Sequence, residues 1–238
     1  MPAYNEAVRL GPTLERLQEY LEQQDYTWKV VIVSDGSSDE TPDIVRSFAE
    51  NHPNFSLHHY VPNRGKGYAV RTGMLTVEAD WLLFSDADLA APIEEIEKLW
   101  EKVGEDCKLA IGSRPLQDSQ LEIRQPWYRE MAGRSFNFAV QTLAVRGIKD
   151  TQCGFKLFEQ SVARDIFTRC KLDGFGFDFE SLMIARDLGY EIAEVPIRWS
   201  HQEGSKVNML RDGIRMLSEL VTRRLLGKKR RLQPRNEH

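Results

Sequence analysis

Cysteine is scarce in this sequence: only Cys107, Cys153 and Cys170 occur among 238 residues, and no two of them have C-x-x-C spacing. An odd number of cysteines in this arrangement favours neither a disulfide framework nor a zinc site, and a reducing, cytosolic setting fits best. No apolar run of about 18 residues occurs, and the first residues lack the basic and apolar regions of a signal peptide. The sequence therefore predicts neither a membrane-spanning helix nor a secreted protein.

A strong excess of one charge is also absent. The chain has 32 Lys and Arg against 36 Asp and Glu, a formal net charge of −4. From Lys206 to His238, however, ten basic residues stand against three acidic ones, a local excess of +7 that leaves −11 for residues 1–205. The acidic body argues against nucleic-acid binding by the whole chain. We expect one domain over 1–205, followed by a basic amphipathic helix and tail over 206–238.

Apolar runs rich in β-branched and aromatic residues alternate with helical patterns along the chain. The runs, each ended by turn-forming residues, are WKVVIVSDG, FSLHHYVP, DWLLFSDAD, KLAIGSR and EIAEVPIRW. Helical patterns begin near Pro42 and Pro92, and others are expected at about 130–145, 159–168, 178–188 and 207–227. The alternation predicts an α/β fold with a mostly parallel, twisted sheet flanked by helices and a helical C-terminal part. Ligands of such a sheet bind at the carboxyl ends of its strands.

Two aspartates follow the apolar run WLLF directly. Asp86 and Asp88, in SDAD, stand two apart and could approach one hard divalent ion, whose shell would be completed by phosphates and water. The other reading is an Asx turn that caps the helix beginning at Pro92. The spacing alone leaves both readings open.

The segment NRGKGYAVRTGM, residues 63–74, concentrates positive charge and glycine after another predicted strand. Gly65 and Gly67 allow close approach of the backbone, and the neighbouring cations, Lys66 among them, suit a diphosphate. The segment is not a P-loop, because the required glycine and hydroxyl positions are missing. Asp35, at the end of the preceding strand, could accept hydrogen bonds from a nucleotide.

Eight motifs together resemble those of the GT-A family 2 glycosyltransferases in order and approximate spacing. They are PAYNEA, VSDGSSDET, NRGKGYAVRTGM, SDAD, GSR, DTQCGFKLF, FDFE and EGSK, and they extend from residue 2 to residue 206. More narrowly, they resemble those of the polyprenyl- and dolichyl-phosphate sugar synthases, and DTQCGFKLF is most similar to the dolichyl-phosphate glucosyltransferase branch. The resemblance implies transfer of a hexose, most naturally glucose from UDP-glucose, to a polyprenyl or dolichyl phosphate.

The resemblance also implies roles for individual residues. The nucleotide sugar would be bound by Ala3, Tyr4, Glu6, Asp35, Gly65, Lys66, Gly67, Asp86, Gly154 and Lys156. The acceptor phosphate would face Arg114, Arg129, Ser205 and Lys206. Asp86 and Asp88 would hold Mg²⁺ or Mn²⁺, and the catalytic set would be Asp86, Asp88, Arg114, Arg129 and Lys206.

A phosphate acceptor changes what the site has to supply. The second pKa of a phosphoryl group is about 6, so the acceptor is largely anionic at neutral pH and needs positive charge rather than a general base. A sugar hydroxyl would need a base, and Asp178 and Glu180 in FDFE occupy the place of that carboxylate in relatives that act on hydroxyls. Alternatives are therefore a hydroxyl-acceptor transferase, a mannosyltransferase that uses GDP-mannose, and a non-catalytic nucleotide-sugar-binding module.

Two departures from the resemblance stand at the start of the chain. Relatives carry a hydrophobic strand before PAYNEA, and we expect the true start to lie upstream of Met1. Relatives also carry an acidic residue where this sequence has Ser34.

The basic C-terminal segment predicts a peripheral membrane contact. Its stripe Leu210, Ile214, Leu217, Val221 and Leu225, followed by GKKRR, can rest on the anionic cytosolic face of a membrane, where a polyprenyl acceptor resides. The alternative is a helix packed on its own domain.

Overall fold

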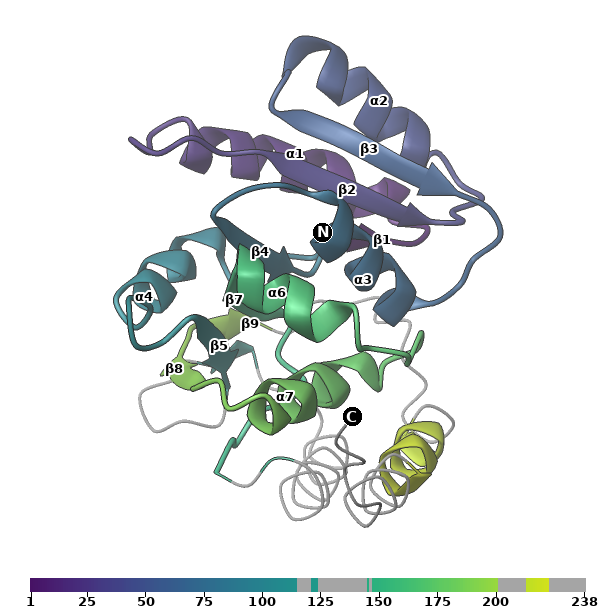
Figure 1. The fold of residues 1–238 in the computed structure, drawn as a ribbon. Coiled ribbons are helices and arrows are strands. Elements are labelled where there is room, and N and C mark those ends of the chain that lie inside the picture. The colour runs from purple at the N-terminus through teal and green to yellow at the C-terminus, as the bar shows by residue number, and fades with distance from the viewer. Residues whose placement is uncertain (115–120, 124–144, 146, 201–212, 223–238) are drawn as a thin grey trace, which may run out of the picture.

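The structure, a computed structural model, describes residues 1–114, 121–123, 145, 147–200 and 213–222 (Figure 1). The strands are β1 (Pro2–Ala3), β2 (Val30–Asp35), β3 (Phe55–Tyr60), β4 (Trp81–Ser85), β5 (Leu109–Ser113), β6 (Leu121–Ile123), β7 (Phe155–Glu159), β8 (Ala193–Pro196) and β9 (Trp199–Ser200). The helices are α1 (Ala7–Leu21), α2 (Thr41–Asn51), α3 (Lys66–Thr76), the 3₁₀ turn η1 (Ile93–Glu95), α4 (Ile96–Trp100), α6 (Gln160–Phe167) and α7 (Phe177–Asp187).

One sheet consists of three parallel strands in the order β1-β2-β3. β2 pairs with β3 along its whole length, whereas β1 pairs only Pro2 with Val33 and Ala3 with Ser34. The apolar face of α1, with Leu10 and Leu14 fully buried, packs in the same core cluster as residues of β2, α2 and β3. All five predicted apolar runs contain a strand.

A second sheet has the order β4-β7-β5-β8 (Figure 1). β7 runs antiparallel to both of its neighbours, and β5 pairs in parallel with β8. The expectation of a mostly parallel sheet is therefore confirmed for the first sheet and modified for the second, where the antiparallel β7 was not predicted. β7 lies in the motif DTQCGFKLF and brings Gly154, just before it, to the end of β4, since Ser85 pairs with Phe155.

The predicted helices at 159–168 and 178–188 are confirmed as α6 and α7, while the one at 130–145 lies outside the described residues. Residues 213–222 are helical, within the predicted basic helix. On that helix Met216 and Leu220 are buried and pack against Phe179 of α7, whereas Ile214 is 67% exposed and Val221 47%. The division at residue 205 stays a prediction. Among the described residues no helix has the length and hydropathy needed to cross a bilayer.

Candidate active site

Contacts between distant parts of the chain gather the loops that follow β1, β2 and β4. The backbone N–H of Asn5, after β1, donates to Ser37 Oγ at 3.0 Å, after β2. Lys66, at the start of α3, pairs with Asp86, directly after β4. These loops therefore form one polar site at the carboxyl ends of the strands, where a ligand of an α/β sheet is expected.

The carboxylate of Asp35, at the end of β2, is buried and accepts four hydrogen bonds. Its Oδ1 accepts from the Tyr60 hydroxyl and from the Arg64 N–H, both at 2.8 Å. Its Oδ2 accepts from Asn63 Nδ2 at 2.9 Å and from the Gly65 N–H at 2.8 Å. Burial, together with the hydrogen bond to Asp35, raises the pKa of Tyr60, so this hydroxyl remains a donor. Asp35 thus holds the loop that precedes α3, and its contact with a nucleotide stays a prediction.

Gly65, at the end of this loop, and Gly67, in the first turn of α3, are required by packing against another segment. Gly65 has φ +106°, and a Cβ there would lie 2.5 Å from the carbonyl oxygen of Asp173. A Cβ at Gly67 would lie 2.4 Å from the carbonyl oxygen of Leu172. The close backbone approach that we expected toward a diphosphate is therefore made here toward residues 172–174, because only glycine leaves room for that backbone.

Two cations of the segment 63–74, one in the loop and one in α3, contact neighbouring side chains. The guanidinium of Arg64 lies 3.5 Å from the centroid of the Tyr68 ring. Arg71 pairs with Asp173 at 2.6 Å, which fastens α3 to the same 172–174 segment. These contacts keep the loop and α3 in a fixed position beside the site.

Lys66 is the loop cation that reaches the aspartates after β4. Its Nζ lies 2.7 Å from Asp86 Oδ1, and both side chains are partly buried. Burial lowers the pKa of Lys66, but the carboxylates of Asp86 and Asp178 more than offset that effect and raise the pKa above its usual value. The ammonium is therefore a permanent positive charge next to SDAD.

Asp86 and Asp88 are held on a tight turn. The N–H of Asp86 donates to the Gly154 carbonyl at 3.1 Å, and a Cβ at Gly154 would lie 2.0 Å from Asp86 Oδ2. Asp88 Oδ1 accepts the Ala90 N–H at 3.1 Å, the Asx-turn contact of the alternative reading. The pKa of Asp88 is raised, mainly by burial and then by repulsion from Asp86.

A cation shared by Asp86 and Asp88 would offset the repulsion that raises the pKa of Asp88, in addition to the charge of Lys66 at Asp86, and a divalent ion at this pair stays a prediction. The described residues contain no cluster of three or more His, Cys, Asp and Glu with metal-site geometry. Most of the ion's ligands would therefore have to be oxygens of the substrate and of water, as is common for Mg²⁺.

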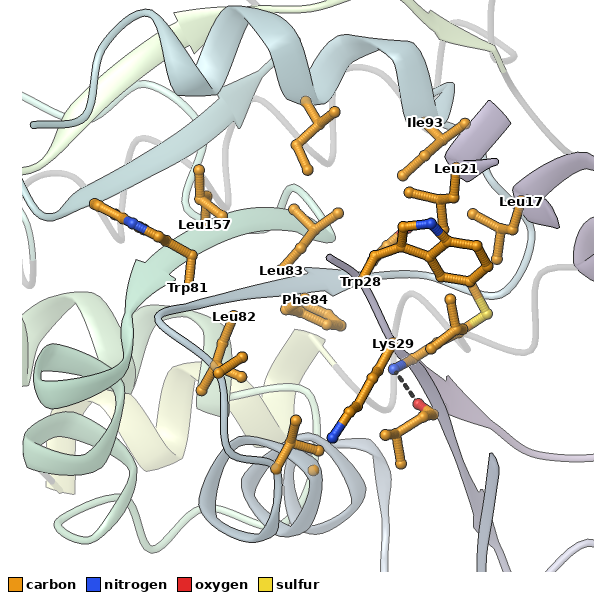
Figure 2. Close-up of a pocket in the computed structure, with 18 of the residues that line it drawn as sticks. Leu17, Leu21, Trp28, Lys29, Trp81, Leu82, Leu83, Phe84, Ile93 and Leu157 are labelled. Carbon is orange, nitrogen blue, oxygen red and sulfur yellow. Dashed lines mark hydrogen bonds between the residues drawn. The ribbon is translucent and has the colours of Figure 1, made fainter. Parts of the chain in front are cut away.

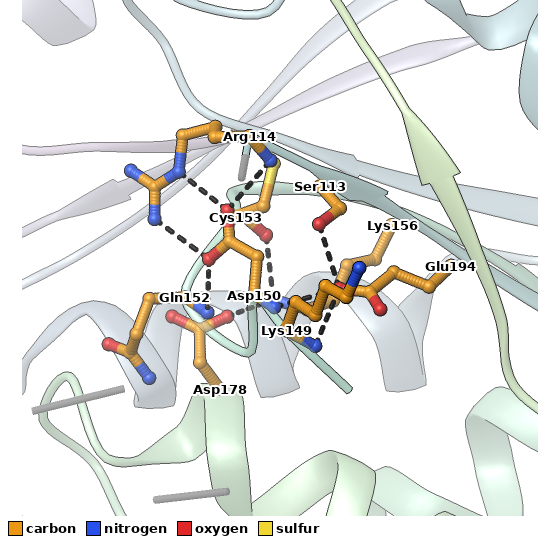
Figure 3. Close-up of polar contacts among 9 residues, drawn as sticks. All are labelled: Ser113, Arg114, Lys149, Asp150, Gln152, Cys153, Lys156, Asp178 and Glu194. Carbon is orange, nitrogen blue, oxygen red and sulfur yellow. Dashed lines mark hydrogen bonds and ion pairs between the residues drawn. The ribbon is translucent and has the colours of Figure 1, made fainter. Parts of the chain in front are cut away.

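Lys156 and Asp178 form a buried ion pair (Figure 3). Lys156 is 1% exposed and Asp178 2%. The Lys156 ammonium donates to Asp178 Oδ1 and, at 2.7 Å, to the carbonyl of Cys153. Burial raises the pKa of Asp178, and the attraction of Lys156 and of Lys66 offsets this only in part. Lys156 thus faces a carboxylate in the core, and its predicted contact with the sugar stays a prediction.

Arg114, which follows β5, forms a bidentate ion pair with Asp150 (Figure 3). Its Nε and Nη2 donate to the Asp150 carboxylate at 2.6 and 2.8 Å, and its backbone N–H donates to the same carboxylate at 3.1 Å. Asp150 is fully buried, and although burial would raise its pKa, Arg114 lowers it below its usual value. Asp150 in turn is held by Glu194 of β8, whose Oε1 accepts its N–H at 2.8 Å. The position of the Arg114 guanidinium is therefore set before any ligand binds.

Sequence reasoning did not find these supporting carboxylates. In the sequence, Asp150 stands out only as a member of the motif DTQCGFKLF, and Glu194 only as a member of the apolar run EIAEVPIRW. No spacing or periodicity in the sequence signals the contact of Asp150 with Arg114, because the two residues are 36 positions apart. Only the pairing of β5 with β8 brings Glu194 to the same point.

The segment after β1 is fixed by side chains that follow β2. The N–H groups of Glu6 and Ala7 donate to Thr41 Oγ1 at 2.7 Å and to Asp39 Oδ2 at 3.1 Å. Ala3 is buried and Tyr4 is 40% exposed, while the Glu6 carboxylate pairs with an arginine one turn along α1. The structure thus places these predicted nucleotide-binding residues beside the loop after β2.

The chain also matches a family of known proteins. Residues 1–167 match the model of the family described as glycosyl transferase family 2, which is more than half of the chain. The chain belongs to glycosyl transferase family 2.

Curated relatives of this family 2 chain are named alike. The dolichyl-phosphate beta-glucosyltransferase of Dictyostelium discoideum is 37% identical over 242 residues, which cover 95% of this chain and 74% of the relative. The protein of that name from Drosophila melanogaster is 37% identical, in an alignment that covers 87% of this chain and 68% of the relative. The one from Saccharomyces cerevisiae is 35% identical, in an alignment that covers 94% of this chain and 73% of the relative.

Solved structures of lower sequence identity share the GT-A fold of this family 2 chain. Mannosyl-3-phosphoglycerate synthase from Rubrobacter xylanophilus aligns with a TM-score of 0.66 at 18% identity, over 99% of this chain and 75% of that one. Glucosyl-3-phosphoglycerate synthase from Mycobacterium tuberculosis, solved with Mn²⁺, UDP and glucosyl-3-phosphoglycerate, aligns with a TM-score of 0.63 at 17% identity, over 95% and 77%. The expected fold class is confirmed.

The predicted site residues of this family 2 chain divide into two groups. In the first group, contacts join the loops after β1, β2 and β4 and Gly154, while Arg114 and Lys156 are held by their own carboxylates, Asp150 and Asp178. Arg129, Ser205 and Lys206 lie outside the described residues, so their place at the acceptor stays a prediction.

Proposed function

We propose that this chain transfers glucose from UDP-glucose to the phosphate of a dolichyl or polyprenyl phosphate, with inversion at the anomeric carbon. The names of relatives that match it over most of its length support this reaction. The observation in the structure that favours a phosphate acceptor is the buried pair of Asp178 and Lys156.

The donor end of the site has to stabilise the diphosphate that leaves the sugar. Lys66 lies against Asp86 and carries a charge that persists at neutral pH. Asp86 and Asp88 would hold a divalent ion, Mg²⁺ or Mn²⁺, which when bound would stabilise negative charge on the leaving group. Tyr4, Glu6 and the loop held by Asp35 surround the nucleotide in this proposal.

The group that the acceptor end of the site must supply differs between a phosphate acceptor and a hydroxyl acceptor. A general base must reach the proton that it removes, at about 2.6–3.2 Å. Asp178 is 2% exposed and already accepts the ammonium of Lys156, so it is poorly placed to take a proton from a hydroxyl. A phosphate acceptor needs no proton removed and instead needs hydrogen-bond donors and positive charge. In this proposal Arg114 offers its remaining guanidinium nitrogen, Nη1, because Nε and Nη2 bond to Asp150, and Lys206 adds the positive charge that Asp150 offsets at Arg114. Arg129, Ser205 and Lys206 complete the acceptor site in this proposal.

The acceptor's lipid tail requires a surface next to the membrane. Ile214 and Val221, exposed on the helix over 213–222, provide apolar contacts at the cytosolic face, and the basic residues that follow favour anionic lipids. Met216 and Leu220, in contrast, hold this helix on α7. In this proposal the helix therefore packs on the domain and also faces the lipid.

A panel of donors and acceptors tests the proposed function. Purified protein with Mn²⁺ or Mg²⁺ is given UDP-glucose or GDP-mannose, and either a short polyprenyl phosphate or the matching polyprenol. We expect turnover with UDP-glucose and the phosphate alone. Preference for GDP-mannose would favour the mannosyltransferase alternative, transfer to the alcohol would favour the hydroxyl-acceptor one, and donor binding without turnover would favour a binding module.

A further inference from the structure

Glu180, the second carboxylate of FDFE, is fully buried in the first turn of α7. Its Oε2 accepts two hydrogen bonds, from the backbone N–H groups of Lys171 and Leu172, both at 2.8 Å. Hydrogen bonds to a carboxylate are about twice as strong as those between neutral groups. Glu180 therefore holds the start of residues 171–175, an irregular segment between α6 and α7 that we call the α6–α7 connection.

The α6–α7 connection lies against α3, which carries Lys66 at its start. The N–H of Tyr68 donates to the Asp173 carbonyl at 3.2 Å, and the Arg71 guanidinium pairs with the Asp173 carboxylate at 2.6 Å. The two glycines described above leave no room for a Cβ between α3 and this connection. Because the two backbones are in contact, a shift of the connection would move the start of α3 with it.

The α6–α7 connection also forms one side of the space around the Lys66 ammonium. That group lies 5.9 Å from the ring centroid of Phe175, in the connection, and 5.5 Å from that of Phe84, in β4. A cation is attracted to an aromatic ring within about 6 Å. Phe84 is 2% exposed and lines the apolar cavity shown in Figure 2, so packing within the core fixes its ring. Phe175 belongs to the irregular connection, and its position depends on the contacts that hold the connection.

We propose that Glu180 is a positioning residue of the donor site, which holds the α6–α7 connection and thereby sets the place of Lys66 beside Asp86. This inference rests on the proposed function, in which Lys66 stabilises the leaving diphosphate. Glu180 is 0% exposed, whereas a general base must come within about 2.6–3.2 Å of the proton that it removes. Both carboxylates of FDFE then bond to groups of the protein itself, Asp178 to Lys156 and Glu180 to backbone N–H groups.

Two substitutions of Glu180 separate positioning from base catalysis. Glu180→Gln keeps a side-chain oxygen that can accept both N–H groups but cannot act as a base, whereas Glu180→Leu removes the acceptor at similar size. The Kd of UDP-glucose with Mn²⁺, the KM of a short polyprenyl phosphate and kcat are measured well below the Tm of each variant. We expect Glu180→Gln to stay within about threefold of the wild type in all three, and Glu180→Leu to raise the Kd of UDP-glucose by about tenfold at an unchanged acceptor KM.

Amide hydrogen exchange reports on the same contacts without any substrate. In Glu180→Leu, exchange should be at least about tenfold faster at Leu172, which loses its acceptor, and at Tyr68, which lies on α3 and bonds to the connection. Glu180→Gln should leave both rates near those of the wild type. Asp173→Asn weakens the contact with α3 from a side chain that is 41% exposed, and it should raise the Kd of UDP-glucose by about two- to threefold.

Several results would overturn this role of Glu180. An equal loss of kcat in both variants, by about 10²- to 10⁴-fold at an unchanged Kd of UDP-glucose, would make Glu180 a general base. A lower Tm of Glu180→Leu with wild-type donor affinity and wild-type exchange at Tyr68 would restrict the residue to the stability of the fold. If Glu180→Leu fails to fold, an unchanged donor affinity of Asp173→Asn would refute the proposal. A wild type that does not bind UDP-glucose would contradict the proposed function instead, and exchange at Tyr68 would still support or refute the contact.

Discussion

The substitution Asp178→Asn distinguishes a structural carboxylate from a catalytic base. The amide is almost isosteric with the carboxylate but leaves the Lys156 ammonium, which is 1% exposed, without its counter-ion. Removing one partner of a buried ion pair costs about 3–5 kcal/mol. We expect a loss of about 3 kcal/mol, at the lower end of that range, because the Lys156 ammonium keeps its hydrogen bond to the Cys153 carbonyl.

For a protein of this size, about 3 kcal/mol corresponds to a fall in Tm of roughly 6–12 °C. The kcat measured well below that Tm should fall by less than about tenfold, because a phosphate acceptor needs no proton removed. Thermal unfolding and kcat with a short polyprenyl phosphate check both numbers. The double variant Asp178→Asn with Lys156→Met should regain much of the stability, since it leaves no buried charge unpaired.

The opposite pattern would refute the reasoning. If Asp178 were a general base, Asp178→Asn would lower kcat by about 10²- to 10⁴-fold, with an unchanged acceptor KM and a pH profile that loses its acidic limb. An unchanged Tm would show in addition that the ion pair contributes nothing to the fold.

Three further substitutions test other parts of the site. Asp88→Asn should abolish turnover at an unchanged Tm, because it removes a charged metal ligand from a turn, and near-normal activity at saturating Mn²⁺ would contradict this role. Gly154→Ala should lower kcat/KM by about 100-fold, because the new Cβ would lie 2.0 Å from Asp86 Oδ2 and would displace that carboxylate. The control Gly104→Ala, whose Cβ would lie in open space, should match the wild type in the same assay. Ile214→Glu should lower the activity on an acceptor in vesicles by about tenfold and leave the activity on a short soluble acceptor unchanged. The control Ser218→Glu, on the same helix, should change neither activity. Equal losses on both acceptors would mean that Ile214 contributes to the fold rather than to the membrane contact.

Much of the fold could be predicted because the local pattern and the tertiary environment agree. β2 and β4 are apolar runs with turn formers after them, and α6 and α7 lie where helical patterns were expected. The antiparallel β7 was not predicted. Its residues FKLFE follow a glycine within the motif DTQCGFKLF, and a local sequence pattern does not indicate whether a strand runs parallel or antiparallel to its partners.

The site was predictable in its residues but not in its contacts. Asp86 and Lys66 were both identified, yet their pairing depends on how α3 lies beside β4. The partners of Arg114 and Lys156 are 36 and 22 residues distant in sequence, so no periodicity joins them. The glycines of the loop before α3 were recognised as points of close approach, but only the structure identifies the neighbouring backbone as that of residues 172–174.

Transfer of glucose to a phosphate oxygen is tested most directly by the structure of the product. The protein is incubated with UDP-glucose, Mn²⁺ and a short polyprenyl phosphate, and the product is examined by ³¹P and ¹H NMR. We expect the phosphate monoester to become a diester whose phosphorus couples to the anomeric proton of a β-linked glucose. A phosphate that remains a monoester while glucose is attached through a hydroxyl, or an α-linked product, would contradict the proposed reaction.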